Sequence, residues 1–189
     1  LNWKVPASFA LVEVNSPTFT TDQGYAGNGT TSYLNTQFTP STNGVNLTQN
    51  SATIGVWSRT AAAQGASTFG NATGTGSLLV VPRITGDNFN YRVNQTTTAA
   101  TANTDGSGHY AASRSASNAT QGYKNGATAG SAGSVASAAL PSVALNIGRV
   151  ASGFSAAQVA AAYAGGNLTS TEHANLHSAL NAYMTRSEE

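Results

Sequence analysis

The sequence is poor in charge and has no cysteine. Of its 189 residues only 8% are charged, against about 25% in an average soluble protein, and the formal net charge is +1. The eight lysines and arginines are scattered singly, whereas a nucleic-acid-binding surface gathers several cations on one face. We therefore expect no nucleic-acid partner. The lack of cysteine excludes disulfides and leaves the redox compartment open.

Long apolar runs are also missing. No stretch approaches the roughly 20 apolar residues of a membrane-spanning helix, so we expect no membrane partner. The opening residues, LNWKVPASFALVEV, lack Met and lack the basic start and long apolar centre of a signal peptide. We expect the chain to be part of a longer protein.

Serine, threonine, asparagine, glycine and alanine take the place of the missing charges. Hydrophobic residues make up 40% of the chain, and aliphatic and aromatic residues recur regularly, whereas a disordered chain has many charges and few such residues. A chain of this length can bury a core without disulfides. We expect a single domain over residues 1–189, with an uncharged, hydroxyl-rich surface typical of secreted or particle-borne β proteins.

Short alternating segments between turn residues predict an all-β fold. Pro82 favours a strand edge or end, and Asn125-Gly126 predicts a hairpin turn. Two stretches of small residues, 60–68 and 127–140, are predicted to be long loops, either mobile or packed against a neighbouring subunit. The expected strands cover residues 33–38, 52–59, 77–84, 88–94, 109–114, 120–124, 143–150 and 157–165.

The end of the chain has helical periodicity instead. Leu176, Leu180 and Tyr183 with Met184 fall on one stripe. Thr169 and Glu172 fit a capping box, in which a hydroxyl and a carboxylate satisfy amides of the first turn. We expect a helix at about residues 170–185.

The order of these segments resembles the concanavalin A-like lectin/glucanase sandwiches, close to laminin-G-like modules. GYAGNGTTSYLNTQF is similar to the opening strand of that family, SATIGVWSR to its next strand, GYKNG to its hairpin, and LNIGRV with the helical end to its closing elements. The resemblance spans about residues 18–184. It implies an antiparallel two-sheet jelly-roll sandwich with one C-terminal helix. The composition is most similar to versions found in phage and prophage virion proteins.

The acidic residues argue against catalysis. Retaining glucanases of this fold use a Glu-x-Asp-x-x-Glu strand, because hydrolysis needs two carboxyl groups about 5 Å apart. The chain has seven acidic residues, and no two of them lie two to five residues apart on an expected strand. We predict that the protein is not an enzyme.

Metal binding has limited support. By the resemblance, Asp87 and Asp105 lie in loops that could offer oxygen ligands to Ca²⁺, but one carboxylate each falls short of a tight site, and turn chemistry explains Asp-Gly equally well. His173 and His177 lie four residues apart without the His-Glu-x-x-His pattern, which favours a surface or half-buried pair on a helix. We expect no cofactor, with calcium as the alternative.

Sugar binding needs an aromatic platform with amide, hydroxyl or guanidinium partners. If the alternation holds, each of three strands brings two such side chains to one face. The alternatives are that Trp57 is a core or rim aromatic and that the arginines are ordinary solvated charges. The candidate residues are Trp57, Arg59, Tyr33, Asn35, Arg92 and Asn94.

Three functions remain in view. The first is a non-enzymatic, lectin-like binding module of a phage or phage-like particle that contacts host-surface glycan, located on a virion or extracellular surface. The second is a structural module of the same fold that attaches to other virion proteins or to copies of itself as a homo-oligomer. The third is a polysaccharide hydrolase. The small-residue segments and the scarcity of charge favour protein packing as much as sugar binding.

Overall fold

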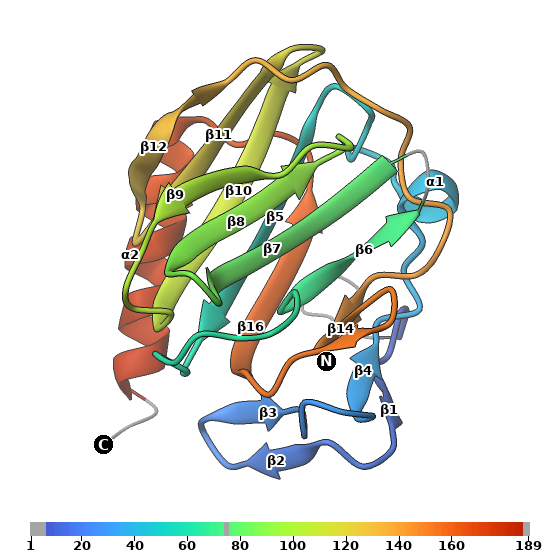
Figure 1. Ribbon diagram of the computed structural model, residues 1–189, viewed down its shortest axis with the longest axis vertical. Helices are drawn as coiled ribbons and strands as arrows, with labels where there is room; N and C mark the ends of the chain where they lie inside the picture. The colour runs from blue at the N-terminus through green and yellow to red at the C-terminus, as the bar shows by residue number, and fades with distance from the viewer. Residues whose placement is uncertain (1–6, 74–75, 187–189) are drawn as a thin grey trace.

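The computed structural model describes residues 7–73 and 76–186. Within them, two seven-stranded antiparallel sheets face each other, and one long helix lies on the outer face of the second sheet (Figure 1). The expected two-sheet sandwich with a C-terminal helix is confirmed. No helix in this part of the chain is long and apolar enough to cross a membrane.

Each sheet combines strands from distant parts of the chain. In spatial order, the first sheet contains β1 (Val12–Val14), β4 (Tyr33–Asn35), β13 (Asn146–Ile147), β6 (Phe69–Thr73), β7 (Gly76–Ile84), β8 (Asn88–Val93) and β9 (Ala99–Ala102). The second contains, in the same sense, β12 (Ala127–Gly133), β11 (Ala119–Lys124), β10 (Gly108–Ala116), β5 (Ala52–Ser58), β16 (Gln158–Gly165), β3 (Gly24–Ala26) and β2 (Thr18–Thr20). The remaining elements are the small hairpin of β14 (Arg149–Val150) and β15 (Gly153–Phe154), the four-residue helix α1 (Pro40–Asn43) and the long helix α2 (Ser170–Arg186).

Every second residue of the central strands fills the space between the sheets. Ile54 and Val56 of β5 meet Tyr110 and Ala112 of β10 in one buried cluster. All four side chains are 0% exposed. The period-2 alternation of the sequence therefore identified one face of β5 correctly.

The other face of β5 is covered by α2. Trp57 is only 8% exposed and packs against Leu180 and Met184 of the helix. Beside it, Gly55 lies under the ring of Tyr163, where a Cβ would stand 2.4 Å from the ring atom Cζ. Because the helix and the opposite sheet enclose it from both sides, β5 is buried over its whole length.

The hairpin at Asn125-Gly126 is confirmed, with φ of 50° and 80° at the two turn residues. The loop predicted over residues 127–140 is wrong in its first half, because β12 continues the hairpin as the edge strand of the second sheet. Its small side chains have little intrinsic β propensity. Pairing with β11, which follows from the turn, makes it a strand.

Two other expectations differ in detail. Pro82 lies inside β7, a central strand, but at the point where the register with β8 shifts between Val81 and Ile84. Such an irregularity accommodates a residue that cannot donate to the ladder. The strand expected over residues 143–150 is two short strands, β13 and β14, separated by Gly148 at a φ of 83°.

Candidate functional site

The six candidate binding residues lie in three separate places. Trp57 is enclosed by α2, so it is a core aromatic, which is the alternative that the sequence left open. Arg59 lies beside the same helix, and its Nη2 donates to the backbone oxygens of Met184 and Asp22, both at 3.4 Å. Trp57 therefore offers no open aromatic platform to a sugar, because a helix far along the chain covers it.

Arg92 and Asn94 of the β8 region stabilise neighbouring loops. Asn94 is 0% exposed, and its Nδ2 donates to the backbone oxygens of Thr48 and Gln49 at 3.0 and 3.1 Å. The Nε of Arg92 donates to Thr98 Oγ1 at 2.8 Å. Asn94 is thus inaccessible to a ligand.

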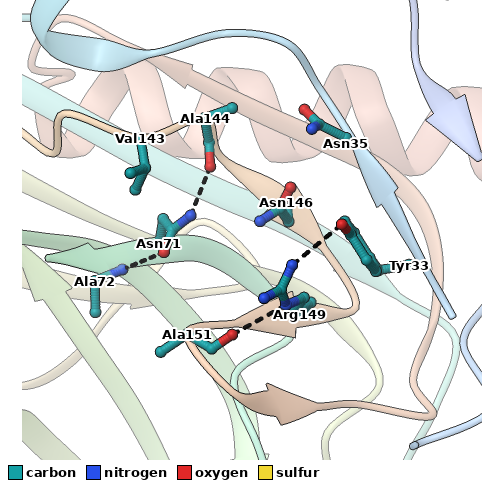
Figure 2. Close-up of a pocket in the computed structure, with 9 residues that line it drawn as sticks. All are labelled: Tyr33, Asn35, Asn71, Ala72, Val143, Ala144, Asn146, Arg149 and Ala151. Atoms are coloured by element: carbon teal, nitrogen blue, oxygen red, sulfur yellow. Dashed lines mark hydrogen bonds between the residues drawn. The ribbon is translucent and has the colours of Figure 1, made fainter. Parts of the chain in front are cut away.

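The remaining pair, Tyr33 and Asn35, lines an open pocket of about 320 Å³ (Figure 2). Leu34 between them is buried, so alternation along β4 directs its two neighbours away from the core. We call this cavity the Tyr33 pocket. Its polar lining consists of Tyr33, Asn35, Asn71, Asn146 and Arg149, from β4, β6, β13 and β14.

Arg149 is held against the tyrosine. Its Nη1 donates to Tyr33 Oη at 3.1 Å and its Nε to the backbone oxygen of Ala151 at 3.0 Å (Figure 2). The guanidinium carbon lies 4.9 Å from the ring centroid of Tyr33 and 5.6 Å from that of Phe154. These cation–π contacts and hydrogen bonds fix the cation at the wall of the pocket.

The three asparagines of the pocket differ in which side-chain amide atoms have a hydrogen-bond partner. Both polar atoms of Asn71 have partners, because its Nδ2 donates to Ala144 O at 2.6 Å and its Oδ1 accepts from the amide of Ala72 at 2.8 Å. Asn35 Oδ1 accepts from the backbone amide two residues on, and no contact of its Nδ2 is seen in the described part of the chain. Asn146 is 6% exposed, and its Oδ1 has no partner among the described residues.

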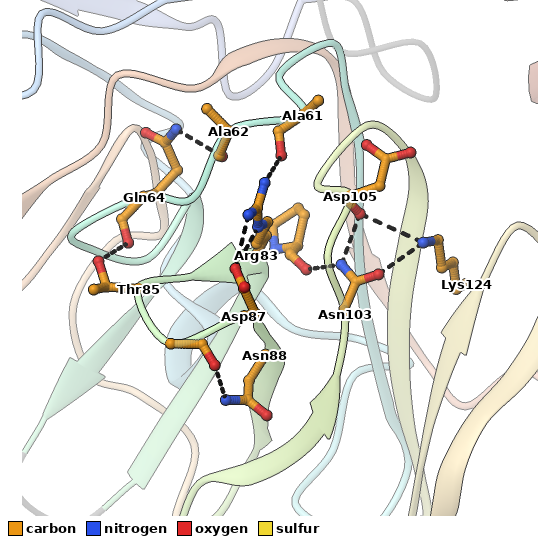
Figure 3. Close-up of polar contacts among 12 residues, drawn as sticks. Ala61, Ala62, Gln64, Arg83, Thr85, Asp87, Asn88, Asn103, Asp105 and Lys124 are labelled. Carbon is orange, nitrogen blue, oxygen red and sulfur yellow. Dashed lines mark hydrogen bonds and ion pairs between the residues drawn. The ribbon is translucent and has the colours of Figure 1, made fainter.

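No carboxylate of the described residues lines the Tyr33 pocket. The aspartates proposed as calcium ligands lie elsewhere, in the loops shown in Figure 3. Asp87 Oδ1 pairs with Arg83 Nη2 at 2.7 Å, and Asp105 Oδ1 accepts from the amide of Ser107 at 2.9 Å. The Ser107 amide, followed by its hydroxyl, lowers the pKa of Asp105.

These contacts give both carboxylates partners within the chain. In the described ranges no group of three or more His, Cys, Asp or Glu could hold a metal ion. Calcium binding stays an untested prediction.

The helix histidines face the second sheet. His173 is 0% exposed, its ring centroid lies 3.7 Å from that of Tyr123, and its Nε2 lies 2.7 Å from Ser113 Oγ. His177 stacks on Trp57. Both histidines therefore help to dock α2 on the sheet. The expected surface or half-buried pair describes His177, which is partly exposed, but is wrong for His173, which is fully buried.

Sequence reasoning missed Arg149 and Asn146. The segment LNIGRV was recognised as a closing strand, but nothing in it marked either side chain as close to Tyr33. The pairing of β13 with β4 brings them together, and that pairing joins segments more than a hundred residues apart. The sequence did contain one indication of this site: Arg149 follows Asn146 by three residues, in a chain with few charged residues.

No protein-family model matches the chain, and no curated protein matches it. Two solved structures of similar fold are a crystal structure of a point mutant of HCR/D and domain 4 of AbnA. The latter belongs to an extracellular GH43 arabinanase from Geobacillus stearothermophilus and was solved in complex with arabinotriose.

The likeness covers most of this chain at low sequence identity. For HCR/D the TM-score is 0.64 with 5% identity, over 90% of this chain and 46% of that chain. For the arabinanase domain the TM-score is 0.62 with 14% identity, over 89% and 87% of the two chains. The chain thus spans less than half of the HCR/D chain and most of the arabinanase domain. These similarities establish the β-sandwich fold.

Proposed function

We propose that this domain is a non-enzymatic binding module that contacts glycan through the Tyr33 pocket. One observation carries the proposal: a half-buried tyrosine, two asparagines with unused amide atoms and an anchored guanidinium meet on the outer surface of one sheet. An aromatic ring packs on the apolar face of a sugar, and amides and guanidinium groups bind its hydroxyls. A rigid sheet positions such groups well.

Two further points support binding without catalysis. Glycoside hydrolysis needs a pair of carboxyl groups flanking the bond, and within residues 7–73 and 76–186 no carboxyl group lines the Tyr33 pocket. The arabinanase domain of similar fold was solved with an oligosaccharide bound. We therefore favour a binding module over a polysaccharide hydrolase.

The biological setting stays a proposal as well. The uncharged, hydroxyl-rich composition favours the surface of a virion or another extracellular location, and a phage particle is the setting that the sequence resemblance suggested. Host-surface glycan would then be the partner.

A glycan-array assay with wild type and Tyr33→Ala, with and without Ca²⁺, tests the function. Tyr183→Ala is the matched control, because Tyr183 is 56% exposed and lies on α2, away from the pocket. We expect binding by wild type and by Tyr183→Ala, and its loss in Tyr33→Ala. Binding that survives Tyr33→Ala would place the glycan elsewhere, and a folded wild type that binds no glycan would sink the proposal.

A structural module is the second candidate, and one observation favours it. Phe19 on β2 and Val12 on β1 are 58% and 45% exposed, and these strands form the edges of their sheets at the same end of the sandwich (Figure 1). Exposed apolar side chains on sheet edges suit contact with another chain. Sedimentation velocity of wild type and Phe19→Ser over a range of concentrations would reveal self-association that depends on this edge.

A further inference from the structure

Arg149 carries the one charge that the described part of the chain contributes to the lining of the Tyr33 pocket. It pairs with no carboxylate in the described part of the chain, whereas Arg83 has Asp87. In water this positive charge is hydrated. A ligand that fills the pocket displaces that water, and a desolvated cation needs an anionic or strongly polar partner in its place.

The guanidinium is also preorganised for such a partner. An arginine has five N–H donors, and the bonds to Tyr33 and Ala151 engage one at Nη1 and the one at Nε. For the second N–H of Nη1 and both of Nη2, no partner is seen among the residues that the structure describes. Because the group is already held against the rings of Tyr33 and Phe154, little side-chain entropy is lost when it binds.

A second, independent feature indicates that the pocket accepts a polar ligand. Asn35 and Asn146 both line the pocket, and no partner of either Nδ2 is seen among the described residues. The Oδ1 of Asn146 is itself closed off from solvent, so this residue meets a ligand through its amide nitrogen. The two Nδ2 groups offer donors to neighbouring hydroxyls of a bound sugar.

From these features we infer that the glycan of the Tyr33 pocket is acidic and that Arg149 binds its carboxylate, an inference that rests on the proposed function. The carboxylate of a uronic or sialic acid matches the planar fork of the guanidinium and forms charge-assisted hydrogen bonds with it. Asn35 and Asn146 then contact hydroxyls of the same sugar. A neutral sugar would leave the guanidinium without a counter-charge.

The test compares acidic and neutral glycans in matched pairs. The probes are oligogalacturonides with galacto-oligosaccharides, and sialyllactose with lactose, with a sulfated lactose as a third arm. Affinities are measured by NMR titration of wild type, Arg149→Gln, Arg149→Lys and Arg83→Gln. Arg83→Gln removes the same charge from the end of β7, outside the pocket, and serves as the control.

We expect wild type to bind a carboxylated glycan at least about tenfold more tightly than its neutral counterpart, with affinity that falls as salt is added. Arg149→Gln loses that preference, Arg149→Lys retains part of it, and Arg83→Gln retains all of it. If an Arg149 variant fails to fold, the preference of the wild type for carboxylated over neutral glycans still tests the inference.

The other outcomes separate the two proposals. Equal or tighter binding of neutral glycans, lost in Tyr33→Ala, overturns the acidic ligand and leaves the binding module standing. Preference for the sulfated lactose over both carboxylated probes overturns the carboxylate as the recognised group. Binding of no glycan at millimolar concentration overturns both.

Discussion

His177 of α2 lies parallel to Trp57 of β5, with 5.8 Å between the ring centroids and 10° between the ring planes. His109 of β10 stacks on both, at 6.3 Å from Trp57 and 5.7 Å from His177. With His173 one turn earlier on the helix, all three histidines of the chain lie between α2 and the second sheet. The docking of the helix therefore depends on how these rings are protonated.

We predict that mild acid destabilises the protein through these histidines. Burial lowers the pKa of His109 and of His173 to about 4, whereas a histidine in the unfolded chain titrates near 6.5. Between these values the unfolded chain binds more protons than the folded one. The free energy of unfolding is therefore at its full value above about pH 6.5 and falls as the pH is lowered towards 4, by up to about 3 kcal/mol for each histidine.

Urea unfolding at pH 7.5 and pH 5, followed by circular dichroism, measures this effect. Asp105 and Glu172 also have lowered pKa values. Their contribution to the free energy of unfolding is lost only below the ordinary carboxyl pKa values near 4, so it does not interfere between pH 7.5 and pH 5. His109→Gln should reduce the difference between the two pH values. Equal free energies of unfolding at both would contradict the prediction.

We predict that Arg114→Lys is strongly destabilising. Arg114 is 0% exposed, and a lysine cannot reproduce its planar set of donors, so several buried acceptors would lose their partners, at a cost of about 3 kcal/mol or more. The Arg114 guanidinium donates hydrogen bonds to Gln95 Oε1 and to the backbone oxygens of Val93, Ala116, Ser117 and Val135.

The control is Arg83→Lys. Arg83 is partly exposed and forms an ion pair with Asp87 in the same chain, and exposed pairs contribute only about 0–1 kcal/mol. Urea unfolding of the two variants compares them directly. Similar small losses in both would show that the buried guanidinium is not needed.

A contrasting pair of glycine substitutions tests the packing under α2. In Gly55→Ala the new Cβ would stand 2.4 Å from atoms of the Tyr163 ring, whose hydroxyl lies 2.7 Å from His109 Nε2. The ring would have to move, and we expect a loss of about 1–3 kcal/mol. At Gly165 nothing lies within 4 Å of the added atom, so Gly165→Ala should change the thermal midpoint little. The reverse order of effects would refute this account of the interface.

The start of α2 offers a further test. Thr169 Oγ1 accepts from the amide of Glu172 at 3.3 Å, and Glu172 Oε2 accepts from the amide of Thr169 at 2.7 Å, as the capping box predicts. Thr169→Ala should therefore cost about 1 kcal/mol of stability. Thr171→Ala alters an exposed threonine inside the same helix and should be close to neutral. Equal effects of the two in thermal unfolding would show that the cap contributes nothing.

The sequence predicted those features that depend on neighbours along the chain. Alternation of apolar and polar residues identified the inward residues of β5. The Asn125-Gly126 pair identified the hairpin of β11 and β12, and Thr169 marked the start of α2. Alternation cannot reveal what covers the outer face of a strand, and the element that covers Trp57 comes near the end of the chain. For the same reason only the tyrosine side of the pocket was predicted, since Arg149 reaches Tyr33 across a separation of 116 residues.

The helix and the Tyr33 pocket belong to different sides of the sandwich: α2 covers the outer face of the second sheet, and the pocket opens from the first (Figures 1 and 2). The chain has no native cysteine. A single introduced thiol on the exposed surface of α2, for example Asn181→Cys, would therefore be the sole point of attachment to a sensor surface. Molecules fixed there would stand in one orientation, with every pocket turned towards the solution.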